Sequence, residues 1–519
     1  MSVADLDAPA SPAGMFGLRD VAERALVEDS ADVIVIGSGA AGATSARVLS
    51  AAGLEVIVLE EGSVLSAPRS DMYTSFKHHW RDMGLQAAEG RAFTPLLQGR
   101  VVGGTTVMNG AIIHRLPEPI YDGWAAEHAV NRSFSYAELE RVFDALDREL
   151  MVGPAPDAVF GENNRLMQLG VERIGATGNR IQRSVSGCRG SAHCNQGCPT
   201  RRKQSMDVSF IPRALEAGAR LYYQCRAERV RAKRSRAEAV EGRFVDPVTR
   251  ARGPRFRFHA RRAIVVCASA IQTPGLLAAS GVGRRSRLLG ERLQAHPGTG
   301  VVGVFDAPVK MSFGATQGYE SKHFWHERMK FEAVGMPLEF AAARLPGIGP
   351  ALMQELASFD HLAIWGVQIR AEAQGQVRRG LFGGTSVHYD LTDADVERLK
   401  LGVSRLIQMM FAAGAREVLP GVHGLPERIS SPDQAAPLAA LPSDPRRFHC
   451  IAAHLFGTAK LGLSPHSSVV DLQGQVHDSP GLYVMDSSIF PTNLGVNPQH
   501  SISALAWLLS ERLAERKAP

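Results

Sequence analysis

Three glycines near the N-terminus have the spacing of a phosphate-binding turn. Gly37, Gly39 and Gly42 follow an apolar run at 33–36 and precede a stretch with helical periodicity. In such a turn the first glycine permits the sharp bend, the second lets the backbone approach a pyrophosphate, and the third allows close helix packing. A second apolar run ends in Glu60, about 20 residues further on, where a carboxylate binds a ribose hydroxyl. The pattern predicts an adenine dinucleotide site, with NAD and FAD both open.

Cysteines form a second group that could do chemistry. The chain has six, and Cys188, Cys194 and Cys198 are crowded into one loop. Because the chain shows no export signal, metal or cluster ligation explains this crowding better than disulfides do. Zinc would need a fourth ligand, and His193 is badly placed to bind the same ion as its neighbour. An iron–sulfur cluster lacking one iron needs only three thiolates.

The predicted helices and strands show how the chain around these glycines and cysteines is organised. Helical periodicity predicts helices over 136–150, 210–218, 393–413 and 501–518, and glycine-dense strand–turn–helix patterns recur at 263–283 and from 481 onward. These recurrences are typical of a cofactor domain assembled from separate segments. Residues 311–444 instead hold aromatic side chains among short strand candidates, which predicts a substrate-shaping domain. Residues 1–29 are predicted to be a loose arm with a short helix at 18–27.

Composition limits the class of protein. A chain of 519 residues exceeds one ordinary core, which predicts two domains, and 45% hydrophobic with 21% charged residues is typical of a soluble globular protein. The net charge of +6 is small and argues against nucleic acid binding, and the arginine-rich stretch 226–236 is interpreted as a solvated surface. No apolar run is long enough to span a membrane. We expect a cytoplasmic protein, with export through a partner subunit left open.

From Ala31 onward the chain resembles the glucose-methanol-choline (GMC) family of flavin oxidoreductases. Six motifs occur in that family's order: the glycine turn, GRVVGGTTVMNG, SAIQTPGLLAASGVG, the HPGTGV segment at His296, HLFGTAKLG at His454, and LYVMDSSIFP with GVNP near the end. The resemblance implies FAD rather than NAD.

The resemblance also implies an α/β fold, α+β overall. A Rossmann-like FAD-binding domain would combine 30–115, 215–310 and 445–519, and an antiparallel-sheet substrate domain with helices would combine 116–214, which includes the Cys-rich loop 188–198, and 311–444. Carried over to this chain, the ADP half of FAD would be held by Gly37, Gly39, Gly42 and Glu60. The pyrophosphate and flavin would be lined by Gly104, Thr105 and Asn109, the adenine by Val230, and the ribityl-pyrophosphate region would be reached by Asp486 through the helix that follows it.

Two residues occupy the family's catalytic places. His454 stands where the base is found, and a neutral imidazole suits that role because its usual pKa lies near working pH. Asn497 stands at the second place, held by His in some members, and would orient the alcohol oxygen. Since Asn cannot accept a full proton, His454 is predicted to be the only base. His500, three residues on, is interpreted as a second-layer or pocket residue and not as a catalytic one.

The Cys loop leaves two interpretations open. Its spacing and the following Pro199 are similar to the loop of FAD sugar dehydrogenases that carry a [3Fe–4S] cluster. That resemblance implies a sugar, glycoside or polyol-like alcohol substrate and electrons passed through the cluster to a cytochrome-like protein or a quinone. The text around Lys203 instead resembles members without iron, and with apolar residues such as Phe340 it favours long-chain or sterol-like alcohols. A non-redox flavin lyase on the same scaffold is the alternative of a different class.

Overall fold

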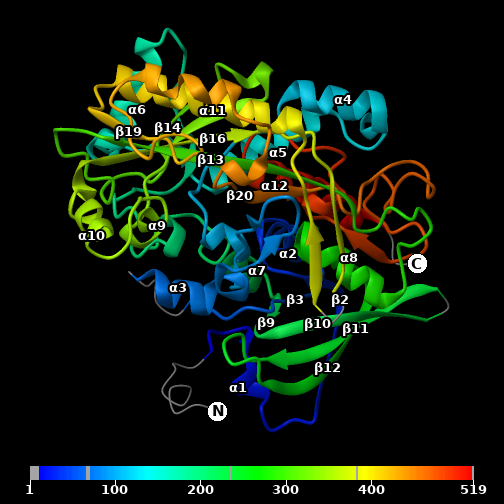
Figure 1. Cartoon of the computed structure of the whole chain (residues 1–519). Coiled ribbons are helices and arrows are strands. Elements are labelled where there is room, and N and C mark those ends of the chain that lie inside the picture. The colour runs from blue at the N-terminus through cyan, green and yellow to red at the C-terminus, as the bar shows by residue number, and fades with distance from the viewer. Residues whose placement is uncertain (1–10, 66–70, 234, 381–383, 517–519) are drawn as a thin grey trace.

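The computed structural model describes residues 11–65, 71–233, 235–380 and 384–516. Its first sheet is mostly parallel (Figure 1). Its strand order is β1-β9-β3-β2-β12-β11-β10, and β21 also pairs with β12. The pairs β2–β3, β3–β9, β2–β12 and β12–β21 are parallel, and β10–β11 and β11–β12 are antiparallel. The bounds are β1 Met15–Phe16, β2 Leu26–Ile36, β3 Val56–Leu59, β9 Arg220–Tyr222, β10 Cys225–Lys233, β11 Arg236–Val245, β12 Arg252–Val266 and β21 Leu482–Val484.

The apolar runs on either side of the glycine turn explain the centre of this sheet. Residues 33–36 of β2 and all of β3 are buried, as expected for parallel strands covered on both faces. Helix α2 contacts both strands and packs against α7 and α12, while α8 contacts β10. The bounds are α2 Ala40–Ala51, α7 Phe210–Glu216, α8 Ser269–Ser280 and α12 Gln499–Glu515. The predicted α/β class with a Rossmann-like unit is confirmed.

A second, antiparallel sheet has the order β18-β17-β13-β16-β15-β14-β7, with β19 and β20 also pairing with β13. Helices α6 and α11 pack against it and share its apolar core. The bounds are β7 Asn179–Arg180, β13 Glu291–Val304, β14 Tyr319–Ser321, β15 Met329–Ala333, β16 Leu362–Ile369, β17 Gly375–Arg379, β18 Thr385–His388, β19 Glu417–Leu419, β20 Ile451–Phe456, α6 Glu162–Arg173 and α11 Asp393–Ala412.

Strands β13 and β20 belong to the substrate-side sheet although their residues fall in ranges predicted for the cofactor domain. The reason is that β13 is 14 residues long and is paired along its length by four other strands. The N-terminal arm also differs from expectation over its described residues. Strand β1 pairs with β9, and α1 (Leu18–Val21) ends before β2 begins. The arm is therefore integrated into the first sheet.

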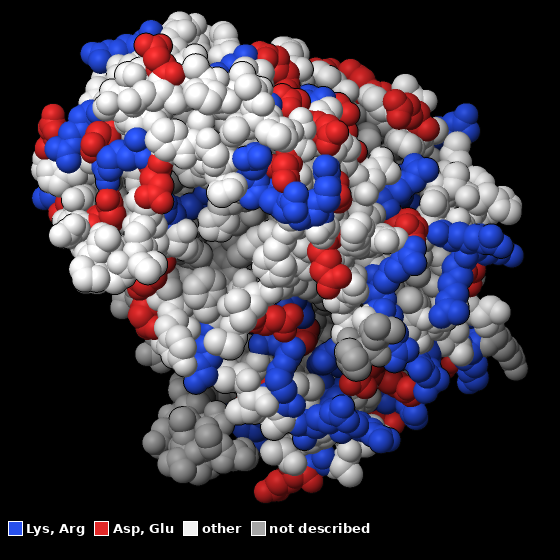
Figure 2. Space-filling model, in the orientation of Figure 1, with Lys and Arg blue, Asp and Glu red and all other residues white. Residues whose placement is uncertain are grey.

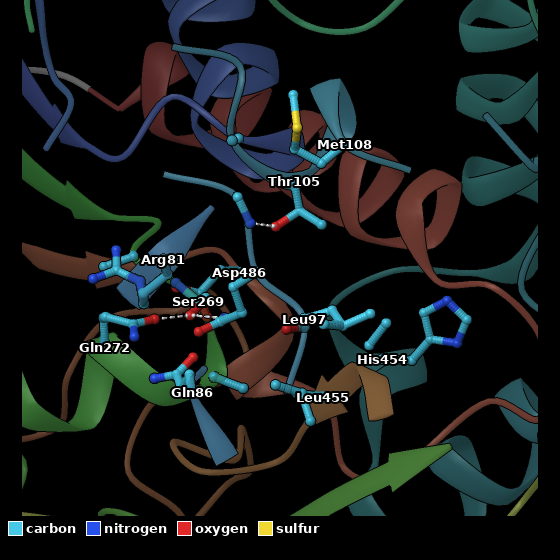
Figure 3. A pocket seen from close by; sticks show the side chains of 18 of the residues that line it. Arg81, Gln86, Leu97, Thr105, Met108, Ser269, Gln272, His454, Leu455 and Asp486 are labelled. Carbon is cyan, nitrogen blue, oxygen red and sulfur yellow. Dashed lines mark hydrogen bonds between the residues drawn. The ribbon is translucent and has the colours of Figure 1, made fainter. Parts of the chain in front are cut away.

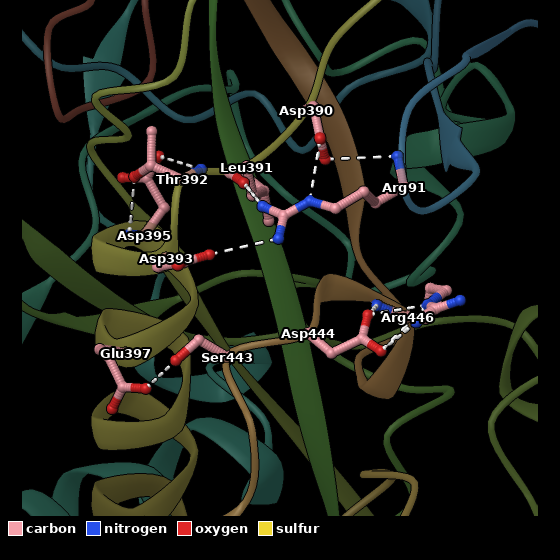
Figure 4. Close-up of polar contacts among 10 residues, drawn as sticks. All are labelled: Arg91, Asp390, Leu391, Thr392, Asp393, Asp395, Glu397, Ser443, Asp444 and Arg446. Atoms are coloured by element: carbon pink, nitrogen blue, oxygen red, sulfur yellow. Dashed lines mark hydrogen bonds and ion pairs between the residues drawn. The ribbon is translucent and has the colours of Figure 1, made fainter.

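Shorter elements complete the described chain. They are α3 Met72–His79, α4 Glu118–His128, α5 Tyr136–Glu149, α9 Leu338–Ala342, α10 Pro350–Ala357, β4 Ala87–Ala88, β5 Thr94–Pro95, β6 Val152–Gly153 and β8 Arg183–Ser184. Helix α11 begins with a capping box, since Thr392 accepts from the Asp395 N–H at 3.1 Å. Arg91, between β4 and β5, donates to Asp390 at 2.9 Å and to Asp393 at 3.2 Å, so this hairpin is tied to the start of α11 (Figure 4).

The charged side chains on the surface are distributed as expected for a chain with a modest net charge. Basic side chains gather over the part of the first sheet formed by β10–β12 (Figure 2). They are locally balanced, since Arg231 and Arg257 both pair with Glu241, at 2.6 and 2.7 Å. Within the described residues, no helix is both long and apolar enough to cross a membrane.

Candidate active site

The glycine turn between β2 and α2 requires glycine at two positions. Gly37 has a φ of +102°, and a Cβ added there would lie 2.3 Å from the Cys267 carbonyl oxygen. A Cβ on Gly42 would lie 1.8 Å from the Gly37 oxygen. At Gly39, by contrast, the nearest atom to an added Cβ is the Gly104 Cα at 3.9 Å, so this backbone faces open space. The three glycines therefore have the roles that the motif predicts.

A large cavity opens at this turn. It has a volume of about 1370 Å³ and extends from Gly37 to His454 (Figure 3). The N-terminus of α2 has no side-chain cap, so its first N–H groups are available to a bound anion. The predicted cofactor residues that line the cavity are Gly37, Gly39, Glu60, Gly104, Thr105, Asn109 and Asp486. A dinucleotide fits this arrangement of an uncapped helix, an open glycine backbone and an elongated cavity.

Two carboxylates on the cavity wall are held in place by the protein. Glu60 accepts from Ser38 Oγ at 2.6 Å and from the Gly62 N–H at 2.8 Å. Burial raises its pKa. Asp486 accepts from the Ser269 N–H at 2.9 Å and from Thr273 Oγ1 at 2.5 Å, and burial raises its pKa as well. Glu60 has the position expected of a ribose ligand, whereas Asp486 ties the start of α8 to the C-terminal segment.

The flavin-side residues are anchored in the same way. Thr105 Oγ1 accepts from the Gly99 N–H at 3.0 Å, and Asn109 Nδ2 donates to Gln499 Oε1 at 2.6 Å. Val230 corrects an expectation, because it is not part of the cavity wall in the described structure. Its side chain is buried and its N–H donates to Ser280 Oγ at 2.9 Å. Residues 225–229 of the same strand line the cavity instead.

His454 and Asn497 meet at the other end of the cavity. His454 Nε2 lies 3.4 Å from Asn497 Nδ2, and its Nδ1 lies 3.3 Å from Nδ1 of His296. Strand β20 carries His454, and the segment just before α12 carries Asn497. The backbone N–H of Gly495 donates to His296 Nε2 at 2.9 Å, which fixes the His296 ring. Both predicted catalytic residues therefore line one end of the cavity.

A buried lysine behind Asn497 sets the orientation of its amide. Lys330 Nζ donates to Asn497 Oδ1 at 2.5 Å, so the amide nitrogen is the atom that faces His454. The same ammonium pairs with Glu332 at 2.5 Å and with Glu320 at 3.2 Å. Although burial alone lowers the pKa of Lys330, these two carboxylates raise it above its usual value. Lys330 is therefore a fixed, fully buried cation.

His454 is held neutral by its surroundings. Burial, with smaller contributions from Lys330 and His114, lowers its pKa to about 3. An imidazole with this pKa is unprotonated at working pH, which is the state a general base requires. The ring is half-buried and faces the cavity, so a bound substrate can reach it.

Sequence reasoning missed Lys330 and its partners. The segment MKFEA in β15 is buried at every position, yet it contains Lys330 and Glu332. Charged residues within a buried strand are almost always paired or functional. This alternation of apolar and opposite charges was the signal available in the sequence.

The Cys loop does not form a metal site. Among the described residues no group of three or more His, Cys, Asp or Glu side chains could hold a metal ion, and all six cysteines are free thiols. Cys194 Sγ accepts from Arg183 Nη2 at 3.1 Å. Burial raises the pKa of Cys194, but Arg183 and Lys203 outweigh this and lower it. The described structure therefore gives no support to Cys188, Cys194 and Cys198 as ligands of a [3Fe–4S] centre, and it places the cations Arg183 and Lys203 beside Cys194.

Lys203 gives the loop a structural role. Its ammonium donates to the carbonyls of Val107, Asn109 and Cys194, at 2.6, 2.9 and 2.8 Å. Burial lowers the pKa of Lys203 to about 8. The Cys loop is thus pinned to the loop 104–110 that lines the flavin end of the cavity.

His500 points away from the cavity. It is fully buried, stacks on Phe143 with ring centroids 5.5 Å apart, and lies 2.8 Å from Asp147. Its neighbours Gln499 and Ile502 line the cavity, but His500 does not. It is a packing residue between α12 and α5, so the expectation of a pocket residue is wrong.

Comparison with known families decides the class. A model of the GMC oxidoreductase N-terminal region matches residues 31–298, and the corresponding C-terminal model matches residues 384–506. This chain belongs to the GMC oxidoreductase family. The two matched regions contain all of the cavity residues discussed above except those of the segment 299–383.

Relatives of this GMC oxidoreductase agree with the assignment. An uncharacterized GMC-type oxidoreductase of Mycobacterium tuberculosis is 34% identical over 490 residues, which cover 93% of this chain and 75% of the relative. A long-chain-alcohol oxidase of Arabidopsis thaliana is 27% identical over 530 residues, covering 95% of this chain and 68% of the relative. Formate oxidase of Aspergillus oryzae RIB40 has a similar fold, with a TM-score of 0.68 at 15% identity, covering 94% of this chain and 98% of that one.

Membership in the GMC family identifies the dinucleotide as FAD. The chain is therefore an FAD-dependent oxidoreductase, which confirms the choice of FAD over NAD. In the cavity the glycine turn and Glu60 would hold the ADP half, and Gly104, Thr105 and Asn109 would lie along the pyrophosphate and flavin. The remaining wall near His454 is left for the substrate.

Proposed function

We propose that this GMC oxidoreductase oxidises a primary alcohol with an apolar chain, with His454 as the base and Asn497 as the residue that orients the hydroxyl oxygen. The observation that carries the proposal is that His454 Nε2 and Asn497 Nδ2 lie 3.4 Å apart on the wall of the cavity that the glycine turn opens. A base and a hydrogen-bond donor side by side are what an alcohol needs at its reacting carbon.

Each residue has one task in this proposal. His454 takes the hydroxyl proton, and the Asn497 amide donates to the oxygen as it becomes a carbonyl. Lys330 keeps the Asn497 amide nitrogen turned toward the substrate by binding Oδ1 at 2.5 Å. FAD, when bound, accepts the hydride that the alcohol carbon loses. The alcohol leaves as an aldehyde, and His454 returns its proton to solvent.

The cavity wall supports an apolar substrate over a sugar. Beyond the catalytic residues its lining includes the apolar side chains Trp80, Met108, Ile112, Val334, Met336, Phe340 and Ile364. Such a surface binds alkyl chains through burial, at about 25 cal/mol per Å². The long-chain-alcohol oxidases among the relatives point the same way.

The electron route is proposed to lead directly from the flavin to an external acceptor. The cysteines do not fit a cluster, so no step is routed through one. Whether the enzyme acts as a dehydrogenase or an oxidase then depends on which acceptor reoxidises the reduced form. Rapid reoxidation by an artificial acceptor and slow reoxidation by oxygen would support a dehydrogenase, and the reverse an oxidase.

Anaerobic mixing tests the proposal. The FAD-loaded protein is mixed with a series of n-alkanols of increasing length and, separately, with glucose and a polyol, and bleaching of the oxidised flavin band is followed. We expect bleaching by alkanols that becomes faster with chain length, and little bleaching by glucose. Bleaching by glucose alone would contradict the apolar substrate. Absence of bleaching by every alcohol would instead favour the non-redox lyase alternative.

A further inference from the structure

An arginine lies on the apolar wall of the substrate cavity with no acid beside it. Arg344 lines the cavity close to Met336 and Phe340, and its Nη1 is buried with no hydrogen-bond partner among the described residues. Burial lowers the pKa of this guanidinium, opposed only by the Cys450 thiol. Leaving a buried charged donor unsatisfied is costly, so such groups normally have a partner. Nothing in the proposed alkanol chemistry uses Arg344.

Strand register places Arg344 at the end of the cavity opposite to His454. On the cavity face of β15 and β16, Lys330 pairs with Gln368 and Glu332 with Gly366, and the Val334 N–H donates to Ile364. Lys330 contacts Asn497 at the catalytic end. Four residues of strand separate Lys330 from Val334, so the two ends of this face are about 13 Å apart.

Helix α9 and Arg344 lie at the Val334 end of that face, away from Asn497. Val334 and Ile364 pack in one small apolar cluster with Ala341 of α9 and with Leu345, the residue next to Arg344. In Figure 1, α9 lies beside α10 at one side of the molecule, whereas β20 lies nearer its middle. Burial, with a contribution from Arg344, lowers the pKa of His449, which comes five residues before His454 on the way into β20.

The path between the two ends suits an alkyl chain. It is bordered by Val334, Met336, Phe340 and Ile364. The one acid on this part of the wall, Glu332, is already neutralised by Lys330 at 2.5 Å and bound by Gln317 at 2.6 Å. A negative charge that would complement Arg344 is thus missing from this part of the described protein, and a bound ligand can supply it.

We propose that the substrate is an ω-hydroxy acid, with its alcohol at His454 and its carboxylate bound by Arg344. This inference rests on the proposed alcohol oxidation and names its substrate class. The planar guanidinium can bind both carboxylate oxygens, which neutral donors cannot do as strongly. A chain whose two ends lie about 13 Å apart fits the length of the sheet face.

The test compares ω-hydroxydodecanoate with dodecanol in the FAD-loaded enzyme. Apparent dissociation constants are taken from the concentration dependence of anaerobic flavin bleaching. We expect the wild type to bind ω-hydroxydodecanoate more tightly than dodecanol. Arg344→Leu should weaken binding of the hydroxy acid about tenfold or more, which is the usual contribution of a charge-assisted hydrogen bond. It should leave the binding of dodecanol unchanged. Arg344→Lys should recover part of the loss.

A matched control and a non-reacting ligand keep the outcomes distinct. Arg416→Leu removes a surface arginine that pairs with Asp306, and it should change the affinity for neither substrate. Dodecanoate, which has no alcohol, should perturb the flavin spectrum in the wild type and lose affinity with Arg344→Leu. Equal weakening of both substrates by Arg344→Leu, or a wild-type preference for dodecanol, would overturn the inference.

These readouts also separate this inference from the proposed function. Bleaching by dodecanol without any advantage for the hydroxy acid would reject the carboxylate site and retain alcohol oxidation. Conversely, Arg344-dependent binding of dodecanoate with no bleaching by any alcohol would retain the anion site and reject the oxidation.

Discussion

At the scale of single residues, His454 is predicted to be needed for chemistry and not for cofactor binding. Replacing it with Ala removes the proton acceptor, so the rate of flavin reduction by an alkanol should fall by about 10²–10⁴. The visible spectrum of bound FAD should stay unchanged. His466→Ala, which alters an exposed histidine, serves as the control. Near-normal flavin reduction in His454→Ala would contradict the assignment of His454 as the base.

The pH dependence of catalysis reports the state of the same ring. A lowered pKa means that the neutral form persists to lower pH, so the acid limb of kcat/KM should lie well below the usual histidine value of about 6.5. Lys330→Met removes a cation that lowers this pKa, so the acid limb should move to higher pH. Lys322→Met, at an exposed lysine that also faces Glu320, should leave the profile in place. An unmoved acid limb in Lys330→Met with normal bound FAD would contradict the role given to Lys330.

The glycine turn gives a paired prediction. Gly37→Ala places a Cβ 2.3 Å from the Cys267 oxygen at a φ of +102°, so the turn has to shift and FAD content should fall sharply. Gly53 also has a positive φ, +82°, but an added Cβ there meets nothing within 4 Å. Gly53→Ala should therefore add about 1–2 kcal/mol of backbone strain to the folded state, which lowers Tm. The variant should keep its FAD. The bound flavin per chain, measured by absorbance, distinguishes the two.

At the scale of elements, the Cys loop is predicted to work as a wall of the flavin site without iron. Purified protein should contain no iron or acid-labile sulfide, and Cys188→Ser should keep both FAD and alkanol-driven flavin reduction. Lys203→Met should instead lower Tm and FAD content, because three carbonyls of the loop and of 107–109 lose their donor. Stoichiometric iron, lost in Cys188→Ser, would show that the loop holds a cluster.

Secondary structure was the part most accessible from local sequence. The helices at 136–149 and 393–412 have apolar periodicity and capping boxes at Ser135 and Thr392, so their bounds were predicted almost to the residue. Long-range strand pairing was not accessible in this way. β20 joins β13 across more than 140 residues, and no local pattern identifies that partner.

At the scale of the whole molecule, FAD is predicted to stabilise both sheets. The cavity is lined by residues of β2, α2 and α8 on one side and of β13, β16 and β20 on the other. Binding at 100 times Kd adds about 2.7 kcal/mol to the free energy of unfolding. Hydrogen exchange of apo and FAD-loaded protein should therefore show added protection in β20 as well as in α2. Protection confined to α2 and its neighbours would contradict a cofactor that bridges the two sheets.

The sequence by itself determined the cofactor class and predicted the reacting pair. The glycine spacing and Glu60 indicate a dinucleotide through the local chemistry of a phosphate-binding turn, whereas FAD, His454 and Asn497 followed from motif order and family resemblance, and the role of the pair stays a prediction. The same reasoning placed Val230 at the adenine, whereas residues 225–229 of its strand line the described cavity. It also predicted a cluster at the cysteines, and no metal-binding group is found among the described residues.

Only the tertiary structure decided what surrounds the reacting pair. Lys330 and Glu320 are ten residues apart in the chain and far from His454, yet they meet behind Asn497. Burial, with a smaller contribution from Lys330, keeps the base neutral. Arg344 is one arginine among many in the sequence, and only folding places it without a partner on an apolar cavity wall. Burial and charge pairing depend on neighbours brought together by two sheets, and a linear sequence does not contain those distances.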